Sequence, residues 1–442
     1  MKRMFALLGI VLLCSLLLIP HVIAERTTSS SEYVLKIYGN ANKDDIIDMR
    51  DVTYIKLVIF GKKPETEFCD ANYDGKVSML DVVQTKLIIV GKAGEITLVD
   101  LVDRTVTVQM PIKKVALLYG LEDYAAVGGE EALNKIVALN SWRYKQYRPD
   151  WWQAWVMKYP WIEDIPDTGQ PGKNFNVEVV INAEPDVAIA DAFMYEKMPE
   201  DIERLEHAGI PIVFTDYFPH SDDVDELYEQ TWDSTMILGT LLGNTERARE
   251  LVSFFEEQIN AVVSKVEGIE SRPKAIVLTT WSEWRAYGQK GMYNYWIIMA
   301  GGENIGAKVV EGSSGDISPE FILEENPDVI IFTCNNNFPS GQKVVIGYTV
   351  SDATAAKDSL QELIDRPGWE ALSAVQNKNV YMIHHGLSHG HLFEFVALQA
   401  IAKWLHPEIF KDVNPEENLK TFYEEFLPLP YKGVWIVSIG GE

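Results

Sequence analysis

The sequence is poor in cysteine and in positive charge, and it contains one long apolar run. Its three cysteines are too few and too scattered to indicate a disulfide framework. Lysine and arginine together number 39 against 65 aspartates and glutamates, so the formal net charge is −26. An acidic surface repels phosphate backbones, which makes nucleic acid an unexpected partner.

The apolar run lies at the N-terminus and is typical of a secretory signal peptide. Lys2 and Arg3 precede an apolar stretch over 5–19, which is shorter than the roughly 20 residues that span a bilayer as a helix. A small-residue cleavage site ends at Ala24, so residues 1–24 are predicted to be removed. We therefore expect an exported protein, extracellular or associated with the cell surface.

Two copies of one loop pattern stand 30 residues apart after the signal peptide. In each copy, oxygen-bearing residues occupy positions 1, 3, 5 and 12, from which ligands converge on calcium in loops of this type. A backbone carbonyl at position 7 and a water held at position 9 would complete each set. The predicted calcium ligands are Asn40, Asn42, Asp44, Ile46, Asp48 and Asp51 in the first copy, and Asp70, Asn72, Asp74, Lys76, Ser78 and Asp81 in the second.

The two predicted calcium sites differ in strength. The first copy has Asn40 in place of a charged ligand and Asp45 where the second has Gly75, so we expect the first site to be the weaker one. A short apolar helix follows each loop, over 52–60 and 82–90. A unit this small buries little core, so calcium should supply much of its folding free energy.

This duplicated pattern resembles a known family. Residues 33–93 are similar to a type I dockerin, the calcium module that binds a cohesin domain on a scaffold or cell surface. The resemblance implies a cohesin-like partner. Dockerin specificity residues at loop positions 10 and 11 correspond to Met49 and Arg50, then Met79 and Leu80, which differ from the common Ser-Thr pair.

Beyond residue 96, strand patterns alternate with helix patterns, which predicts parallel sheets covered on both faces. The segment 103–108 alternates as an edge strand or hairpin does. Short buried strands are predicted over 114–118, 186–190 and 211–215.

A second self-similarity divides this region in two. A helix pattern over 176–181 runs on to Pro-Asp-Val at 185–187, and the same pattern over 318–323 runs on to Pro-Asp-Val at 327–329. The strands preceding the two copies also correspond. The predicted fold class is therefore α/β, with two Rossmann-like lobes joined by a long helix and preceded by the small calcium-loop domain. The predicted boundaries are 97–223 and 267–442 for the lobes and 224–266 for the helix.

The two-lobe pattern resembles the class III periplasmic binding proteins of ABC importers over residues 97 to about 430. The resemblance implies capture of an iron chelate such as a siderophore or haem, with cobalamin as the alternative, and delivery to an ABC permease. It also implies that Glu178 and Glu320 contact permease arginines. Each glutamate is also an early-turn acid of the kind that a helix dipole favours.

Ligands of parallel sheets bind at the carboxyl ends of the strands, so the residues there are the candidate contacts. Aromatic and basic residues alternate over 142–161, which favours either a flat anionic ligand or a helix packed under the lobe. Four of the eight histidines lie within 384–391, where they would ligate a metal, contact a chelate or be ordinary loop residues. The predicted ligand contacts are Tyr119, Arg143, Tyr144, Asp191, Phe193, Tyr217, Trp281, Trp284, Asn336, His384, His385 and His389.

An enzyme is the alternative class, because dockerins commonly accompany glycoside hydrolases. Glu283, between two tryptophans, is the best candidate for a catalytic acid. The sequence shows no eight βα units and no His-Glu-x-x-His helix. We therefore predict a binding protein with no catalytic cofactor.

Overall fold

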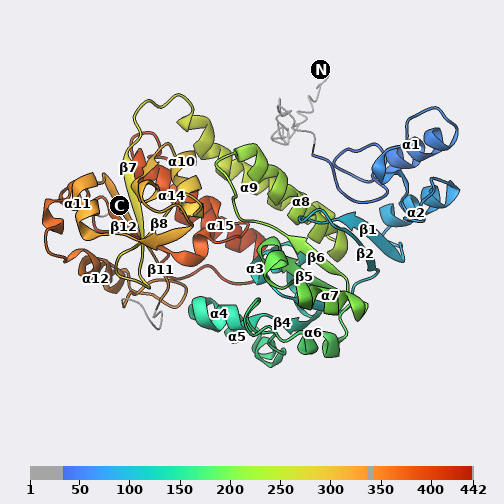
Figure 1. The fold of residues 1–442 in the computed structure, drawn as a ribbon, viewed down its shortest axis with the longest axis horizontal. Helices are drawn as coiled ribbons and strands as arrows, with labels where there is room; N and C mark the ends of the chain where they lie inside the picture. The colour runs from blue at the N-terminus through green and yellow to red at the C-terminus, as the bar shows by residue number, and fades with distance from the viewer. Residues whose placement is uncertain (1–32, 337–342, 441–442) are drawn as a thin grey trace, which may run out of the picture. The chain divides into compact units, whose positions relative to one another are not determined.

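The computed structural model describes residues 33–336 and 343–440. The predicted signal peptide over 1–24 lies outside these ranges. Along the chain in Figure 1, a pair of loop–helix units is followed by a small parallel sheet with its helices and then by a larger mixed sheet with its helices. Within the described ranges, no helix is long and apolar enough to cross a lipid bilayer.

Each duplicated loop leads into an 11-residue helix, α1 (Met49–Ile59) and α2 (Met79–Ile89). Both helices begin three residues before the predicted starts, because the residue at loop position 9 is the N-cap. The side chains of Asp48 and Ser78 accept from the backbone N–H two residues on, and the carboxylate at position 12 accepts from the N-cap N–H. This reciprocal capping joins each loop to its helix.

The first lobe is built on a four-stranded parallel sheet with the order β4-β3-β5-β6. Its strands are β3 (Val115–Leu117), β4 (Ile136–Leu139), β5 (Val187–Asp191) and β6 (Ile212–Thr215). Its helices are α3 (Leu121–Leu133), α4 (Ser141–Tyr147), α5 (Pro149–Lys158), α6 (Val177–Ala183) and α7 (Pro199–His207). The predicted edge strand belongs to an antiparallel hairpin of β1 (Glu95–Val99) and β2 (Thr105–Gln109).

The second lobe contains a seven-stranded mixed sheet, β10-β8-β7-β11-β12-β13 with β9 paired to β7. Its strands are β7 (Lys274–Thr279), β8 (Arg285–Tyr287), β9 (Glu303–Asn304), β10 (Ser314–Asp316), β11 (Val329–Cys334), β12 (Val380–His384) and β13 (Ile436–Ser438). Its helices are α10 (Met292–Met299), α11 (Pro319–Glu325), α12 (Ala353–Ile364), α13 (Ser373–Gln376), α14 (Phe395–Leu405) and α15 (Pro415–Phe426). Strands β7, β11 and β12 are parallel, as predicted for the centre of this lobe.

Short 3-10 turns occur along the whole described chain. They are η1 (Glu67–Cys69), η2 (Pro160–Asp164), η3 (Ala192–Lys197), η4 (Ile305–Lys308), η5 (Trp369–Ala371) and η6 (His385–Ser388).

The Pro-Asp repeat has the same structural role in both lobes. Asp186 Oδ2 accepts from the backbone N–H of Lys114 at 2.8 Å, and Asp328 Oδ2 accepts from that of Lys274 at 2.8 Å. Each aspartate thus fixes the strand that starts beside it. This shared contact explains why one sequence pattern occurs twice, and it confirms the two-lobe prediction.

Two helices, rather than one, connect the lobes. Helices α8 (Val224–Leu242) and α9 (Thr245–Val266) pack against each other, and the chain turns between them at Gly243, whose φ is 76°. Gly239 permits the close contact, because a Cβ built there would lie 2.5 Å from the Cβ of Ala248. The sequence predicts a connecting helix over 224–266 that is interrupted near Gly239 and Gly243. The interruption at Gly243 is a complete turn between two helices, so the single long helix is wrong.

The segment before the first loop contributes to the lobes. Leu35 and Ile37 are buried in the main hydrophobic core, and Ile37 forms an antiparallel bridge with Leu98 of β1. Between them, Lys36 Nζ lies 2.7 Å from Asp233 Oδ2 on α8. The duplicated loops and their helices have a small apolar cluster of their own.

Two tryptophans of the 142–161 segment differ sharply in burial, which gives a test of the core. Trp155 is fully buried and its Nε1 donates to Glu122 Oε1 at 3.2 Å, whereas Trp161 is 37% exposed. We expect Trp155→Ala to lower the free energy of unfolding by about 3–5 kcal/mol, because it opens a cavity and removes one hydrogen-bond donor from the buried carboxylate of Glu122. Urea titration followed by circular dichroism measures this, with Trp161→Ala as the control that changes stability by less than about 1 kcal/mol. Equal losses in the two variants would contradict the packing described here.

Candidate functional site

A cavity of about 250 Å³ lies where the carboxyl end of the first sheet meets η6 of the second lobe. Its described lining contains three cationic residues and no carboxylate, although the whole chain is strongly acidic. Aromatic rings supply most of the remaining wall. The lining residues are Asn140, Trp142, Arg143, Tyr147, Arg148, Gln170, Pro171, Phe193, Lys197 and His385.

Helix α4 and its two capping residues, Asn140 and Arg148, supply half of the lining residues, and local hydrogen bonds position them. Asn140, directly after β4, accepts from the backbone N–H of Arg143 at 3.3 Å and donates to the carbonyl oxygen of Leu118 at 3.1 Å. The first of these bonds caps the helix, and the second ties it to the end of β3. Asp167 Oδ1 also accepts a hydrogen bond from the backbone N–H of Trp142 at 3.1 Å.

Arg143 is held against aromatic rings. Its guanidinium carbon lies 4.6 Å from the ring centroid of Tyr119 and 5.7 Å from that of Phe193, and its Nη2 donates to the Tyr119 hydroxyl at 3.1 Å. Burial raises the pKa of Tyr119, so this tyrosine is a neutral phenol that donates onward to the carbonyl oxygen of His389 at 3.2 Å. The stacking fixes the planar cation while leaving hydrogen-bond donors for a ligand.

Arg148 is the more deeply buried cation, with 3% of its surface exposed. Its guanidinium carbon lies 5.2 Å from the ring centroid of Trp151, and its Nη2 donates to the His389 carbonyl oxygen at 3.3 Å. Its Nη1 contacts His391 Nε2. A guanidinium in so little water attracts an anionic group strongly.

His385 and His389 of the histidine cluster are held neutral. Burial, with neighbouring histidine and arginine charges, lowers the pKa of both His385 and His389 well below the usual range. His385 Nδ1 lies 3.3 Å from Thr333 Oγ1, which leaves its Nε2 as the ring atom to meet a ligand. His389 is engaged on both sides, with Nδ1 2.9 Å from the His385 carbonyl oxygen and Nε2 3.3 Å from the Tyr287 hydroxyl. In the described part of the chain, no three His, Cys, Asp or Glu side chains are grouped to hold a metal ion.

Of the twelve predicted ligand contacts, Arg143, Phe193 and His385 line the cavity. Trp281 is not among the lining residues, but its ring centroid lies 4.8 Å from that of His385, which is. Asn336 is half-buried beside the segment 337–342, which the structure does not describe.

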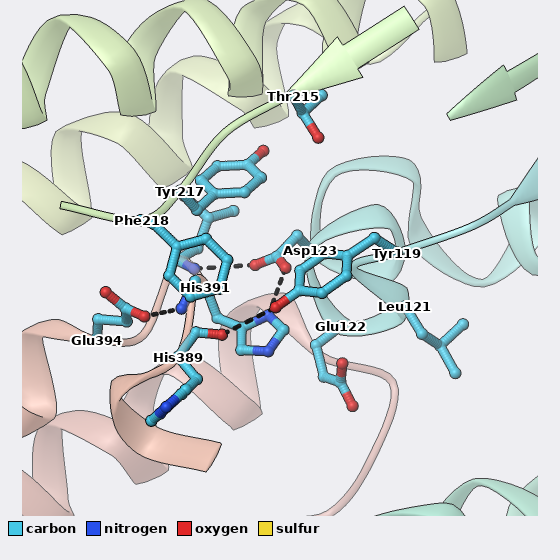
Figure 2. A network of polar contacts seen from close by, with 12 residues as sticks. Tyr119, Leu121, Glu122, Asp123, Thr215, Tyr217, Phe218, His389, His391 and Glu394 are labelled. Atoms are coloured by element: carbon cyan, nitrogen blue, oxygen red, sulfur yellow. Dashed lines mark hydrogen bonds and ion pairs between the residues drawn. The ribbon is translucent and has the colours of Figure 1, made fainter. Parts of the chain in front are cut away.

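The other predicted contacts are outside the lining because internal hydrogen bonds or packing use their side chains. Asp191 caps η3 through the N–H of Phe193, Tyr144 donates to Glu122, and His384 accepts from the N–H of Gly386. Trp284 packs on Arg366, whose guanidinium carbon lies 4.6 Å from its ring centroid. The remaining three, Tyr119, Tyr217 and His389, are buried among the polar groups behind the cavity (Figure 2).

The sequence prediction missed several lining residues. Trp142, Tyr147 and Arg148 belong to the aromatic and basic segment, so their composition signal was visible although their direction was not. Lys197 lies in η3 and Gln170 in a loop, and no local pattern marks either of them. Trp151 and Trp155 are in the core, as the packed-helix interpretation of the 142–161 segment expects, whereas Trp142 lines the cavity. A flat anionic ligand beside this segment stays a prediction.

Both glutamates implicated in permease contact are exposed in the first turn of their helices. Glu178 lies in α6 and Glu320 in α11, at equivalent places in the two lobes. Glu178 Oε1 accepts from Arg204 Nη2 at 2.5 Å.

Comparisons with known proteins agree with this architecture. A sequence profile described as "Periplasmic binding protein" matches residues 116–386, more than half of the chain. The chain is 22% identical over 295 residues to the iron-uptake system-binding protein of Bacillus subtilis, covering 64% of this chain and 78% of that protein. It is 20% identical over 353 residues to the molybdate-binding protein MolA of Haemophilus influenzae, covering 76% and 92%.

A solved structure is also similar. The TroA-like periplasmic binding protein FepB from Veillonella parvula matches with a TM-score of 0.70 at 28% identity, covering 78% of this chain and 99% of that chain. Proteins of this kind are exported solute-binding proteins of ABC importers and are not enzymes. The catalytic alternative with Glu283 is therefore wrong, and that side chain is exposed at the surface. The matched profile and the two-lobe fold together lead to one assignment: this chain belongs to the periplasmic binding protein family.

Proposed function

We propose that the protein captures an anionic iron chelate, a siderophore complex or haem, in the cavity beside α4 and delivers it to an ABC permease. The observation that carries this proposal is the lining itself, with Arg143, Arg148 and Lys197 set among aromatic rings and without a carboxylate among the described residues. Charge-assisted hydrogen bonds from guanidinium groups suit carboxylate, catecholate or propionate oxygens. The relative that is named for iron uptake supports the same ligand class.

The size of the cavity favours a compact ligand. At about 250 Å³ it lies below the roughly 300–1,000 Å³ of most small-molecule sites, so a small siderophore complex fits better than haem, and a corrinoid such as cobalamin, the largest candidate, has the least support. A tetrahedral oxyanion is the second candidate, because two guanidiniums and an ammonium match its charge and because one relative is named as a molybdate-binding protein.

The ligand proposal predicts a large effect from one cavity cation. Arg143→Gln should weaken binding by about 10- to 100-fold, because it removes a charge-assisted hydrogen bond from a site with little water. Titration calorimetry with a ferric catecholate, a ferric hydroxamate, haemin, cobalamin and molybdate first identifies which probe binds. The affinity of the variant for that probe then gives the effect.

The exposed Arg272→Gln variant is the matched control, and it should bind as the unaltered protein does. Failure of every probe to bind would refute the proposed ligand class. Unchanged affinity in Arg143→Gln would refute the assignment of the cavity.

Permease docking through both lobes is part of the proposal. Glu178 and Glu320 hold equivalent exposed positions, so they can offer one carboxylate per lobe to a symmetric partner. We expect the double variant Glu178→Ala with Glu320→Ala to bind ligand normally and to lose most ligand uptake in a reconstituted transport assay. The exposed pair Glu200→Ala with Glu324→Ala is the control. Full uptake by the first double variant would disprove this docking role.

We also propose that the duplicated loops bind calcium, the first more weakly, and that they tether the protein through a cohesin-like partner. The loop residues carry the oxygen donors that calcium prefers, although no three of their carboxylates are grouped as a metal site in the described structure. The buried Oδ1 atoms of Asn40 and Asn72 have no hydrogen-bond partner among the described residues. The amide nitrogen of Asn40 donates to the carbonyl oxygens of Leu35 and Asp44, which fixes the direction of its oxygen. Calcium would supply the missing partner for such oxygens.

One contact explains why the first loop should be weaker. Arg50 lies with Nη2 3.0 Å from Asp44 Oδ2 and Nε 2.9 Å from Asp48 Oδ2, so a guanidinium already neutralises two predicted ligands there. The equivalent position in the second loop is Leu80, which brings no charge. A cation entering the first loop must therefore compete with Arg50.

An apolar surface supports the proposed tether. The exposed side chains on and beside α1 and α2 are unusual for a surface that stays in water. They are Met49, Phe60, Met79, Leu80, Val83 and Val90, each more than half exposed. A cohesin-like domain is the partner that we propose for this surface.

The calcium proposal predicts two unequal sites. Calcium titration of the metal-stripped protein, followed by calorimetry, should show two binding events. Asp70→Ala should remove the tighter event and Asn40→Ala the weaker one, because each deletes the first ligand of its loop. Absence of binding at millimolar calcium would refute the sites, and loss of the same event in both variants would refute the order.

A further inference from the structure

A segment of the second lobe reaches into the first lobe directly behind the cavity. Residues 385–394 follow β12, and Figure 2 shows the His389 carbonyl oxygen and the His391 ring of this segment directed at Tyr119 and Asp123 of the first lobe. His391 and Asp123 are 2% and 1% exposed, so these contacts exclude water.

Asp123 receives two donors from the segment. Its Oδ1 accepts from the backbone N–H of Leu392 at 2.9 Å, and its Oδ2 lies 2.6 Å from His391 Nδ1. On the other side of the imidazole ring, Nε2 contacts Nη1 of Arg148. One histidine of the second lobe thus lies between an acid and a cation of the first.

The direction of these hydrogen bonds follows from the chemistry of arginine. A guanidinium only donates, so His391 Nε2 must accept and its proton must be on Nδ1, which donates to Asp123. Burial and the nearby Arg148 charge lower the pKa of His391 well below its usual range, which agrees with a neutral ring.

The carbonyl oxygen of His389 is a second junction. It accepts from Arg148 Nη2 at 3.3 Å and from the Tyr119 hydroxyl at 3.2 Å. Because the Tyr119 hydroxyl accepts from Arg143 Nη2 at 3.1 Å, both cavity arginines are linked to this one oxygen. Each therefore takes part of its position from the second lobe.

Steric fit brings the segment this close. Gly390 has a φ of 73°, and a Cβ built on it would lie 2.6 Å from the ring of Phe218. A larger residue would act as a wedge between the lobes.

We propose that Asp123, His391 and the His389 carbonyl oxygen form an interlobe clamp that sets the positions of Arg143 and Arg148. His391 is thus a positioning residue for ligand binding. When the lobes separate, Arg148 loses its acceptors His391 Nε2 and the His389 carbonyl oxygen, and Tyr119, which holds Arg143, loses its own acceptor. The cavity then loses the geometry that holds an anion. The effect on ligand affinity rests on the proposed function, whereas the clamp itself is tested without ligand.

Amide hydrogen exchange of the ligand-free full chain, resolved by mass spectrometry, tests the clamp. In His391→Leu and in Gly390→Ala, the amides of 385–394 should exchange at least about tenfold faster, because each change breaks or wedges apart the buried contacts. His391→Gln keeps one donor and one acceptor, so it should restore part of the protection.

Two controls separate the clamp from general loss of stability. Gly209→Ala has the same kind of strained backbone, with a φ of 79°, but its added Cβ meets nothing within 4 Å. His406→Leu removes another buried histidine, whose Nε2 lies 3.2 Å from the Gly301 carbonyl oxygen. Neither should change exchange in 385–394.

Unchanged exchange in both His391→Leu and Gly390→Ala would overturn the clamp. Should His391→Leu fail to fold, Gly390→Ala and Asp123→Asn decide the question by the same measurement. Molybdate and haemin affinity form a separate readout, and about tenfold weaker binding of either in His391→Leu, with recovery in His391→Gln, supports the positioning role. If the ferric catecholate, the ferric hydroxamate, haemin, cobalamin and molybdate all fail to bind the unaltered protein, the proposed ligand class fails, while exchange still decides the clamp.

Discussion

The burial of Arg148 is the constraint on which the arrangement of the site depends. An arginine that is 97% removed from water is stable only when fixed acceptors replace the hydration of its guanidinium. The His389 carbonyl oxygen and His391 Nε2, both of the second lobe, are such acceptors. The charge that makes the cavity attractive to an anion therefore also holds the two lobes together.

The same requirement explains the polar groups behind the cavity. Glu122, buried at 1% exposure, accepts from the Tyr144 hydroxyl and from Trp155 Nε1. Asp150 accepts from the backbone N–H of Tyr348 at 2.7 Å, which is another contact between the lobes. Buried acids on the first lobe thus meet donors rather than solvent, and each pairing restricts how α4 and α5 can move relative to the second lobe.

The sequence predicted the architecture well because its signals are local and repeated. Asp186 and Asp328 each accept from the backbone N–H at the start of the neighbouring strand. In both places where the Pro-Asp-Val pattern occurs in this chain, it therefore marks the same unit of helix and strand. The helix pair α8 and α9 was harder to predict, since Gly243 could mark either an irregularity in one helix or a turn between two. Only the packing of Gly239 against Ala248 distinguishes these possibilities.

The site was less predictable because side-chain direction depends on tertiary contacts. Asp191 and Phe193 follow the same strand, yet the aspartate turns back to cap η3 while the ring faces the cavity. The density of histidines marked the segment that borders the cavity, but it did not indicate which histidine side chain reaches the cavity. His385 reaches the cavity, whereas His384 is fixed by the Gly386 N–H and His391 lies between Asp123 and Arg148.

The contrast between the acidic chain and its cationic cavity limits how the ligand is recognised. A net charge of −26 repels anions at long range, but salt screens this repulsion beyond about 8 Å at physiological ionic strength. The proposed anion binding must therefore depend on short-range contacts with Arg143, Arg148 and Lys197 rather than on electrostatic steering. Aromatic faces beside the guanidiniums then favour an anion whose charge is spread over a planar or partly apolar frame, because such an anion loses less hydration on entry.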